Sequence, residues 1–223
     1  MALLVEPPAS AHSEITPLTV EDARALLAAA GGVRLGARWV VGLSLGLRQG
    51  EALGLRWEDV DLTAGVICVR RQLLRPDKKG APLTFGPVKS ARSRRTLALP
   101  GRLAELLAEH RDKQAVEREA AMTWADDRLV FATAKGTPID HRNDAREFKA
   151  LCERAGIPPY RVHDLRHTAA TLLIAQGQHA RVVMEVLGHS QIAMTMNVYG
   201  HVMDSQLRDA ADAVDEALWG EDE

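Results

Sequence analysis

Three stretches near the C-terminal end contain most of the residues that could carry out chemistry: RVHDLRHT at residues 161–168, VLGHS at 186–190 and TMNVYGHV at 195–202. Between them they bring together histidine, arginine and tyrosine side chains, all of which can hold or transfer charge. His163 and Arg166 are three residues apart on one predicted helix, so they share a face of that helix.

Two upstream stretches add further charged groups at the ends of predicted elements. LGLRQGEALGLRWEDVDL places Arg48 at a helix junction with Glu51 after it, and PVKSARSRRTLALP places Lys89 at the end of a predicted strand. Two arginines can grip phosphate oxygens with fixed geometry, and a histidine can add a third donor. A tyrosine can attack phosphorus and a lysine can protonate a leaving alkoxide. This set can form a phosphoryl-transfer site with a covalent intermediate and no metal.

The composition is typical of a globular protein. The 223 residues are 46% hydrophobic and 26% charged, which are ordinary values for a folded domain. No stretch approaches the roughly 20 apolar residues of a membrane span, so an integral membrane protein is excluded. We expect no signal peptide and a cytoplasmic location. Cys68 and Cys152 are the two cysteines, which excludes a disulfide scaffold and a cysteine-based zinc site.

The net charge of −2 hides a strong separation of charge. Residues 204–223 carry eight acidic groups and one basic group, whereas residues 70–95 carry nine basic groups and one acidic group. The basic segment predicts either a phosphate-binding surface or a solvated basic hairpin. Its nine basic residues are Arg70, Arg71, Arg75, Lys78, Lys79, Lys89, Arg92, Arg94 and Arg95.

The pattern of apolar residues predicts a mainly α chain with one small antiparallel sheet. Residues 1–16 have no apolar period and are interpreted as a linker or an unstructured arm. The β-type runs at 65–74, 83–89 and 94–99 predict a three-stranded sheet that carries most of the basic residues, and residues 58–62 resemble a turn. Capping residues and glycines predict helices from Thr19 to Gly31, at 36–46 and 49–55, from Pro100 to about 121, at 141–155, from His163 to Gly177, and at 179–187, 191–198 and 204–218.

The ordered set Arg…Lys…HxxR…His…Tyr, with LGLRxGE, HDLRHT and LGHS…Y, closely resembles the catalytic domain of the tyrosine recombinase, or phage integrase, family. The sequence has 22 residues between Arg166 and His189 and nine between His189 and Tyr199, as in that family. The resemblance covers roughly residues 16–203. It implies an α+β tyrosine recombinase catalytic-domain fold over 17–203. The acidic segment 204–223 is then either a helix that packs on its own core or one that docks in trans on a neighbouring protomer.

The resemblance also implies a role for each matching residue. Tyr199 is the nucleophile that forms a 3′-phosphotyrosyl link, Lys89 is the general acid for the 5′ oxygen, and His163 assists proton transfer. Glu51 orients Arg48. For His201, two residues after Tyr199, two interpretations stay open: it supports the loop of the nucleophile, or it is simply exposed. The scissile phosphate is held by Arg48, Arg166 and His189. The remaining basic residues of the segment are expected to contact DNA, namely Arg70, Arg71, Arg75, Lys78, Lys79, Arg92, Arg94 and Arg95.

Some alternatives remain open at individual positions. Lys78 and Lys79 lie in the same predicted hairpin as Lys89 and compete with it for the acid role. Tyr160 is the only other tyrosine, and its place beside two prolines favours a packing role. His167 is interpreted as a partly buried helix histidine.

The partner implied by the resemblance is double-stranded DNA at a recombination site. The chain is expected to form a homo-oligomer, a tetramer on DNA, and to be a monomer when alone. No metal and no cofactor are expected. Family members usually carry an N-terminal core-binding domain, which is missing here, so we expect either a fragment or a minimal member. The motif variants favour the integrase of a mobile element.

Two other functions fit parts of the pattern. His163 and His167 are spaced like the two histidines of a zinc hydrolase, although Asp164 stands where the catalytic glutamate would be and Arg166 lies between them. The chain could instead be a non-catalytic DNA-binding module with the same fold.

Overall fold

The computed structural model describes residues 16–75, 78, 81–90, 93–126, 128–188 and 214–215. The helix predicted at 191–198 and nearly all of the helix predicted at 204–218 lie outside these ranges. Five of the candidate residues also lie outside them, namely Lys79, Arg92, His189, Tyr199 and His201.

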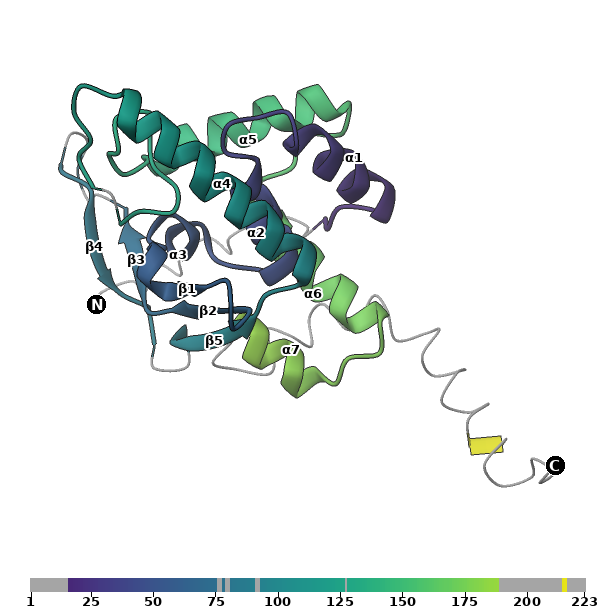
Figure 1. Ribbon diagram of the computed structural model, residues 1–223. Helices are drawn as coiled ribbons and strands as arrows, with labels where there is room; N and C mark the ends of the chain where they lie inside the picture. The colour runs from purple at the N-terminus through teal and green to yellow at the C-terminus, as the bar shows by residue number, and fades with distance from the viewer. Residues whose placement is uncertain are drawn as a thin grey trace, which may run out of the picture.

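The helices follow the expected order, and two of them begin at side-chain caps, whereas α6 begins one residue before the expected His163 (Figure 1). The Thr19 hydroxyl accepts a hydrogen bond from the Asp22 amide at 3.0 Å, and the Asp140 carboxylate accepts one from the Arg142 amide at 2.7 Å. These side chains satisfy amide groups that the first turn of a helix leaves unpaired. The helices are α1 Val20–Ala30, α2 Gly36–Leu45, α3 Gln49–Leu53, α4 Gly101–Ala120, α5 His141–Ala155, α6 Val162–Ala175 and α7 Ala180–Leu187, with a 3₁₀ turn at Trp57–Asp59.

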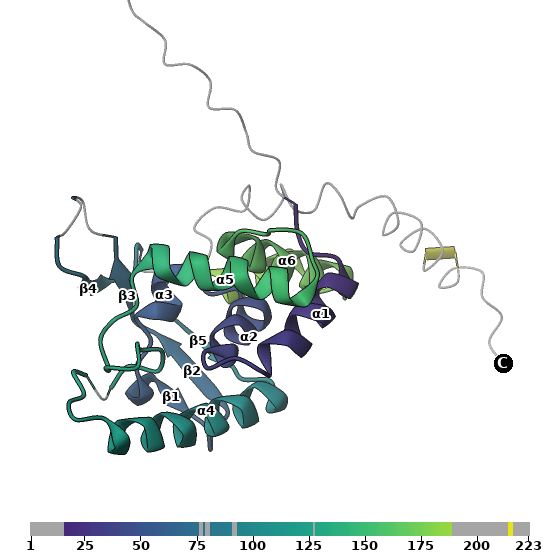
Figure 2. The same ribbon diagram turned by 90° about the horizontal axis from the view of Figure 1, so that it is seen from above.

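Helix α2 is the centre of the fold. It is buried almost all round, and it lies between α4 on one side and α5 on the other (Figure 2). Trp39 packs on Phe148 of α5 with ring centroids 5.1 Å apart. The buried Arg38 forms an ion pair with Asp144 of α5 at 2.9 Å. Removing one partner of such a pair leaves an uncompensated buried charge, so the pair fixes how α5 lies on α2.

The strands form two small antiparallel sheets, so the expectation of a single three-stranded sheet is corrected in detail. One sheet has the order β1-β2-β5, with β1 Val60–Asp61, β2 Val66–Val69 and β5 Arg95–Ala98. The other pairs β3 Arg71–Leu74 with β4 Thr84–Pro87. Residues 58–62, interpreted as a turn, thus contribute a short edge strand.

The run predicted at 65–74 breaks at Arg70, and side-chain contacts explain the break. Arg70 and Arg71 both reach the buried Asp59, at 3.5 and 2.6 Å. Consecutive side chains of a regular strand point to opposite faces, so both cannot reach one carboxylate unless the backbone bends between them. After the bend the pairing partner changes, from Arg95 opposite Val69 to Pro87 opposite Arg71.

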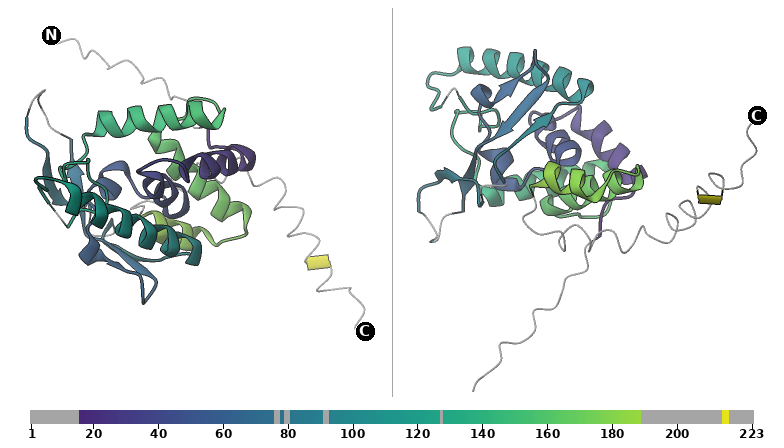
Figure 3. Two further views of the ribbon diagram at one scale, coloured as in Figure 1. Left: turned by 45° about the horizontal axis from the view of Figure 1, so that its top comes forward. Right: turned by 90° about the horizontal axis from the view of Figure 1, so that it is seen from below.

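Helices α6 and α7 close one end of the molecule, with α7 beside β5 (Figure 3). They pack on each other through a small apolar cluster of Ala170, Ile174, Val183 and Leu187. Leu187 also lies against the end of α2. None of the described helices is long and apolar enough to span a membrane.

Gly46 ends α2 in a left-handed conformation, with φ of +59°. A Cβ atom built there would lie 2.4 Å from Cδ2 of the fully buried Leu187 and 3.3 Å from Cβ of Ala169. The chain can therefore turn from α2 into α3 beneath α6 and α7 only with glycine at this position.

We predict that Gly46→Ala lowers the free energy of unfolding by about 1–3 kcal/mol, since a left-handed alanine is strained and its methyl group displaces buried atoms. Gly101→Ala is the matched control, because a Cβ atom at Gly101 meets nothing within 4 Å. We expect it to leave stability unchanged or to raise it by up to about 1 kcal/mol. Urea unfolding measures both changes, and equal stability of the two variants would contradict the argument.

Candidate functional site

The junction between α2 and α3 holds Arg48, whose side chain is one quarter exposed. Its Nη1 donates to Glu51 Oε1 at 2.7 Å, and its own amide donates to Glu51 Oε2 at 3.0 Å. Its Nη2 donates to the carbonyl oxygen of Gly188, at the end of α7, at 3.1 Å. Two anchors on opposite sides thus hold the guanidinium group while part of it faces solvent.

Arg166 approaches the same junction from α6. Its side chain is buried, and Nη1 donates to the carbonyl oxygen of Gly46 at 2.7 Å. Burial and the nearby charge of Arg48 lower the pKa of Arg166 to about 9, which still leaves it protonated at neutral pH. Its Nη2 has no hydrogen-bond partner among the residues that the structure describes. A buried cationic donor without a partner favours an anion beside it.

His163 lies three residues before Arg166 on α6, next to His167. The two imidazole rings meet edge to face, with centroids 4.6 Å apart. His163 is exposed at the surface, but desolvation by the surrounding protein, followed by the influence of His167 and Arg166, lowers its pKa to about 4. Burial also lowers the pKa of His167. At neutral pH His163 is therefore an uncharged imidazole that can accept a proton.

Lys89 is exposed and lies two residues after the end of β4, so the strand predicted to reach Lys89 ends at Pro87. Two serine hydroxyl groups connect Ser90, the residue after Lys89, to Arg48. The hydroxyl groups of Ser90 and Ser93 are 3.0 Å apart, and Arg48 Nη1 lies 3.4 Å from Ser93 Oγ. Lys89 is thus adjacent in sequence to a residue of the site, whereas Lys78 lies in the loop that joins β3 to β4.

The structure thus brings together Arg48, Glu51 and Arg166, with His163 on the same helix as Arg166. His189 and Tyr199 lie outside the described residues, so their places stay predictions. Gly188, which immediately precedes His189, contacts Arg48.

Tyr160 has a structural role. Its hydroxyl donates to Asp22 Oδ2 at 2.6 Å and so joins the loop before α6 to α1. Burial and this hydrogen bond to a carboxylate raise the pKa of Tyr160 to about 12. A phenol that donates to a carboxylate and is harder to ionise than usual is a poor nucleophile.

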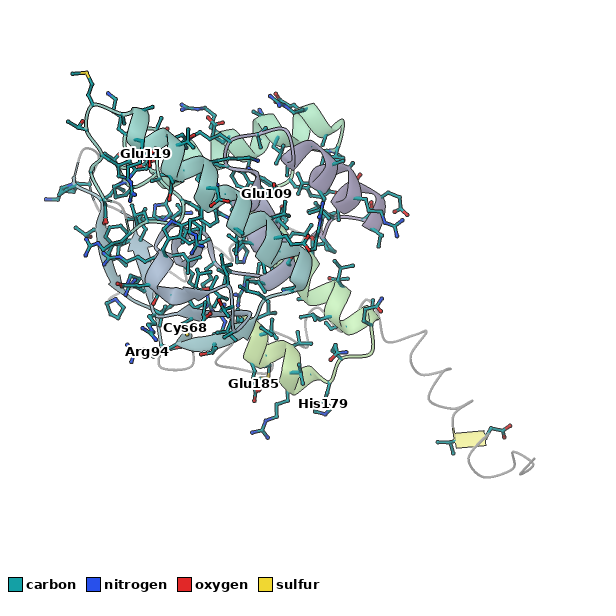
Figure 4. All side chains as sticks on the ribbon, viewed as in Figure 1. Cys68, Arg94, Glu109, Glu119, His179 and Glu185 are labelled. Atoms are coloured by element: carbon teal, nitrogen blue, oxygen red, sulfur yellow. The ribbon has the colours of Figure 1, made fainter. Side chains whose placement is uncertain are left out.

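Two members of the expected basic surface form hydrogen bonds and ion pairs within the protein. Arg71 is bonded to Asp59 and Glu58, at 2.6 and 2.8 Å. The side chain of Arg95 is only 6% exposed. The neighbouring Arg94 is exposed and lies at the outer margin of the molecule (Figure 4). The other described members of the set, Arg70, Arg75 and Lys78, are exposed as expected.

Sequence reasoning missed the place of Arg95 and that of the buried Ser93 beside Arg48. The signal for Arg95 is present in RTLAL at 95–99. Leu97 and Leu99 are buried while Thr96 and Ala98 are exposed. Because side chains of a strand alternate between faces, Arg95 shares the inward face with the two leucines. An interpretation based on the many basic residues of this segment overlooks the alternation of buried and exposed side chains.

His163 and His167 gain no third metal ligand from the described part of the chain. No group of three or more His, Cys, Asp and Glu residues that could hold a metal ion is found there. The alternative of a zinc hydrolase thus receives no support from the described geometry.

A comparison with family models matches residues 17–206 to the phage integrase family. An integrase of Saccharopolyspora erythraea is 33% identical, over 97% of this chain and 61% of the relative. A tyrosine recombinase XerC-like protein of Caldanaerobacter subterraneus subsp. tengcongensis is 34% identical, over 92% of this chain and 55% of the relative. The chain therefore spans a little over half the length of these curated relatives.

Solved structures are similar in fold. The Tn1549 transposon integrase in complex with circular intermediate DNA superposes with a TM-score of 0.75 at 24% identity, over 90% of this chain and 67% of that one. XerA recombinase superposes with a TM-score of 0.67 at 27% identity, over 89% of this chain and 64% of that one. The expected fold class, mainly α with a small antiparallel component, is thereby confirmed.

The lowered pKa of His163 can be tested by an NMR titration of the folded protein. Titration of the imidazole resonances should give His163 a midpoint near 4 in the folded protein and near 6.5 in urea. His167→Ala should raise the folded midpoint, since it removes a neighbour that opposes protonation. Because the unfolded chain binds this proton first, His163 lowers folding stability as the pH falls from about 6.5 to about 4. A folded midpoint at or above 6.5 would contradict this environment.

Proposed function

Because this chain belongs to the phage integrase family, we propose that it cleaves and rejoins DNA strands through a covalent link between Tyr199 and the 3′ phosphate. The double-stranded DNA of a recombination site is the substrate, and a tetramer on that DNA is the working assembly. The catalytic unit is residues 17–203. The acidic segment 204–223 is a separate segment that docks on a neighbouring protomer.

The observation that carries this proposal is the convergence of Arg48 and Arg166 at the end of α2. Each guanidinium group is anchored by one carbonyl oxygen, of Gly188 for Arg48 and of Gly46 for Arg166. Arg48 keeps part of its surface exposed, and Arg166 keeps one donor nitrogen without a partner in the described chain. Two fixed cations with spare donors match a phosphodiester, which gains negative charge as it becomes pentacoordinate.

The reaction is a pair of reversible exchanges at phosphorus. The phenolic oxygen of Tyr199 bonds to phosphorus as the bond to the 5′ oxygen breaks, and the electron pair of that bond leaves with the 5′ oxygen. The tyrosine proton passes to His163, which is neutral at pH 7, and Lys89 gives a proton to the 5′ oxygen. Attack by a 5′ hydroxyl reverses each step. The tyrosyl ester retains the bond energy, so the proposal needs neither a nucleotide nor a metal.

The need for several cations follows from the chemistry of phenol. A tyrosine with a pKa of about 10 is ionised in about one molecule in a thousand at neutral pH, which costs about 4 kcal/mol. A donor aimed at charge that develops in the transition state contributes about 2.7–4 kcal/mol. Arg48, Arg166 and His189 together are thus sufficient to offset this cost and to lower the barrier further.

We predict that the chain forms a covalent adduct with a nicked duplex taken from the DNA that flanks its gene, in the presence of EDTA. Tyr199→Phe should abolish the adduct, because the attacking oxygen is gone. Tyr160→Phe is the matched control and should keep it, since Tyr160 is engaged with Asp22. Denaturing electrophoresis reads out the adduct. Its persistence in Tyr199→Phe would refute the nucleophile, and its absence from the wild-type chain would favour a non-catalytic module.

Binding to duplex DNA should weaken steeply with salt, because contacts to phosphates release counterions. Removing the exposed Arg94 by Arg94→Gln should reduce the slope of log affinity against log salt by about 1. Arg71→Gln should change the slope less, because Asp59 and Glu58 already neutralise this arginine. Fluorescence anisotropy over a salt series measures the slopes, and a flat response would show that the basic segment is not the DNA surface.

A further inference from the structure

Arg95 lies where three segments of the site meet. Its Nη2 donates to Oε2 of Glu51 in α3 at 3.0 Å. Its Nε donates to the carbonyl oxygen of Val186 in α7 at 2.7 Å, and its Nη1 donates to the carbonyl oxygen of Ser93 at 2.9 Å. All three nitrogen atoms of this nearly buried side chain are thus engaged inside the protein.

Glu51 transmits the position of Arg95 to Arg48. Its carboxylate accepts from the side chain and the amide of Arg48 and, on Oε2, also from Arg95. The end of α7 is gripped in the same way, since Arg95 holds the carbonyl group of Val186 and Arg48 holds that of Gly188. Arg95 on β5 therefore holds in place both groups that anchor Arg48, namely Glu51 and the end of α7.

We propose that Arg95 is a positioning residue for DNA cleavage, which holds Glu51 and the end of α7 in the arrangement that aims Arg48 at the scissile phosphate. The inference rests on the proposed function. It replaces the expectation that Arg95 is one of the contacts to DNA.

The charge state of Glu51 gives this role a distinctive signature. Burial acts to raise the pKa of Glu51, but Arg95, by its charge and its hydrogen bond, and Arg48 lower it below the ordinary value. Among the residues that the structure describes, the charged groups that face Glu51 are Arg48 at the cap of α3, Arg95 from β5 and Arg166 from α6. Without Arg95 the carboxyl group takes up a proton at a higher pH, and a protonated Glu51 holds Arg48 less firmly.

The test is single-turnover adduct formation on saturating nicked DNA from about pH 5 to about pH 8. Arg95→Gln should slow the reaction about ten- to a hundredfold near neutral pH, while the affinity for DNA stays within about twofold. Its rate should also begin to fall at a higher pH than that of the wild type. Arg95→Lys should restore the pH profile, because the charge is kept, but only part of the rate, since one ammonium group cannot reproduce the guanidinium fork.

Arg34→Gln is the matched control. Arg34 also joins a carboxylate and a carbonyl group from different segments, Glu117 and Ala132, but it does so away from the site. We expect its rate and pH profile to equal those of the wild type. In a Glu51→Gln background, Arg95→Gln should cost less than it does alone, because the two residues act through one contact.

Three results would overturn the inference: a wild-type rate and pH profile in Arg95→Gln, a loss of rate matched by an equal loss of DNA affinity, or full additivity with Glu51→Gln. If Arg95→Gln does not fold, Arg95→Lys decides, since an unchanged rate in that variant overturns the inference and a slowed rate with normal affinity supports it. Failure of the wild-type chain to form any adduct contradicts the proposed function itself and overturns both.

Discussion

The arrangement of the site depends on one buried carboxylate. Glu51 is 2% exposed and lies between the guanidinium groups of Arg48 and Arg95. An unpaired carboxylate is costly to bury, so the two arginines and the carboxylate hold one another in place. Because the three residues come from a helix cap, a short helix and a strand, the same contacts that keep Glu51 ionised also join α3 to β5. Stability and the aim of Arg48 are therefore parts of one electrostatic arrangement.

The sequence predicted features that depend on local chemistry. Helix α5 begins after Asp140 and ends at Gly156 because a side-chain cap and a left-handed glycine act within a few residues. The convergence of Arg48 and Arg166 was expected from the order and spacing of the motifs, through their resemblance to a family and not through any contact visible in the sequence. Local capping signals thus predicted the helices, and the resemblance to a family predicted the candidate residues.

Long-range contacts set the rest, and these could not be predicted from local patterns. The strand break at Arg70 depends on Asp59, which the two adjacent arginines share. The charge of a segment says nothing about which side of a strand each residue occupies, so the basic pattern alone places Arg95 at the surface. Its alternation with Leu97 and Leu99 carried the correct answer. The burial of Glu51 beside it became visible only once β5 and α3 were placed together.

At Arg70 the chain leaves one sheet and enters the other, because the strands on either side of this residue have different pairing partners. Strand β5 pairs with β2 and strand β4 pairs with β3, so the chain between β4 and β5 passes from one sheet to the other. Lys89 stands at the start of this crossing, and Ser93 is fastened near its end. The pair formed by β3 and β4 is held to the core through β3, because Leu73 is buried and the backbone of Gln72 and Leu73 lies directly against Gly50 and Gly54 of α3 and its cap. The position of Lys89, two residues beyond β4, therefore depends on how β3 packs against α3.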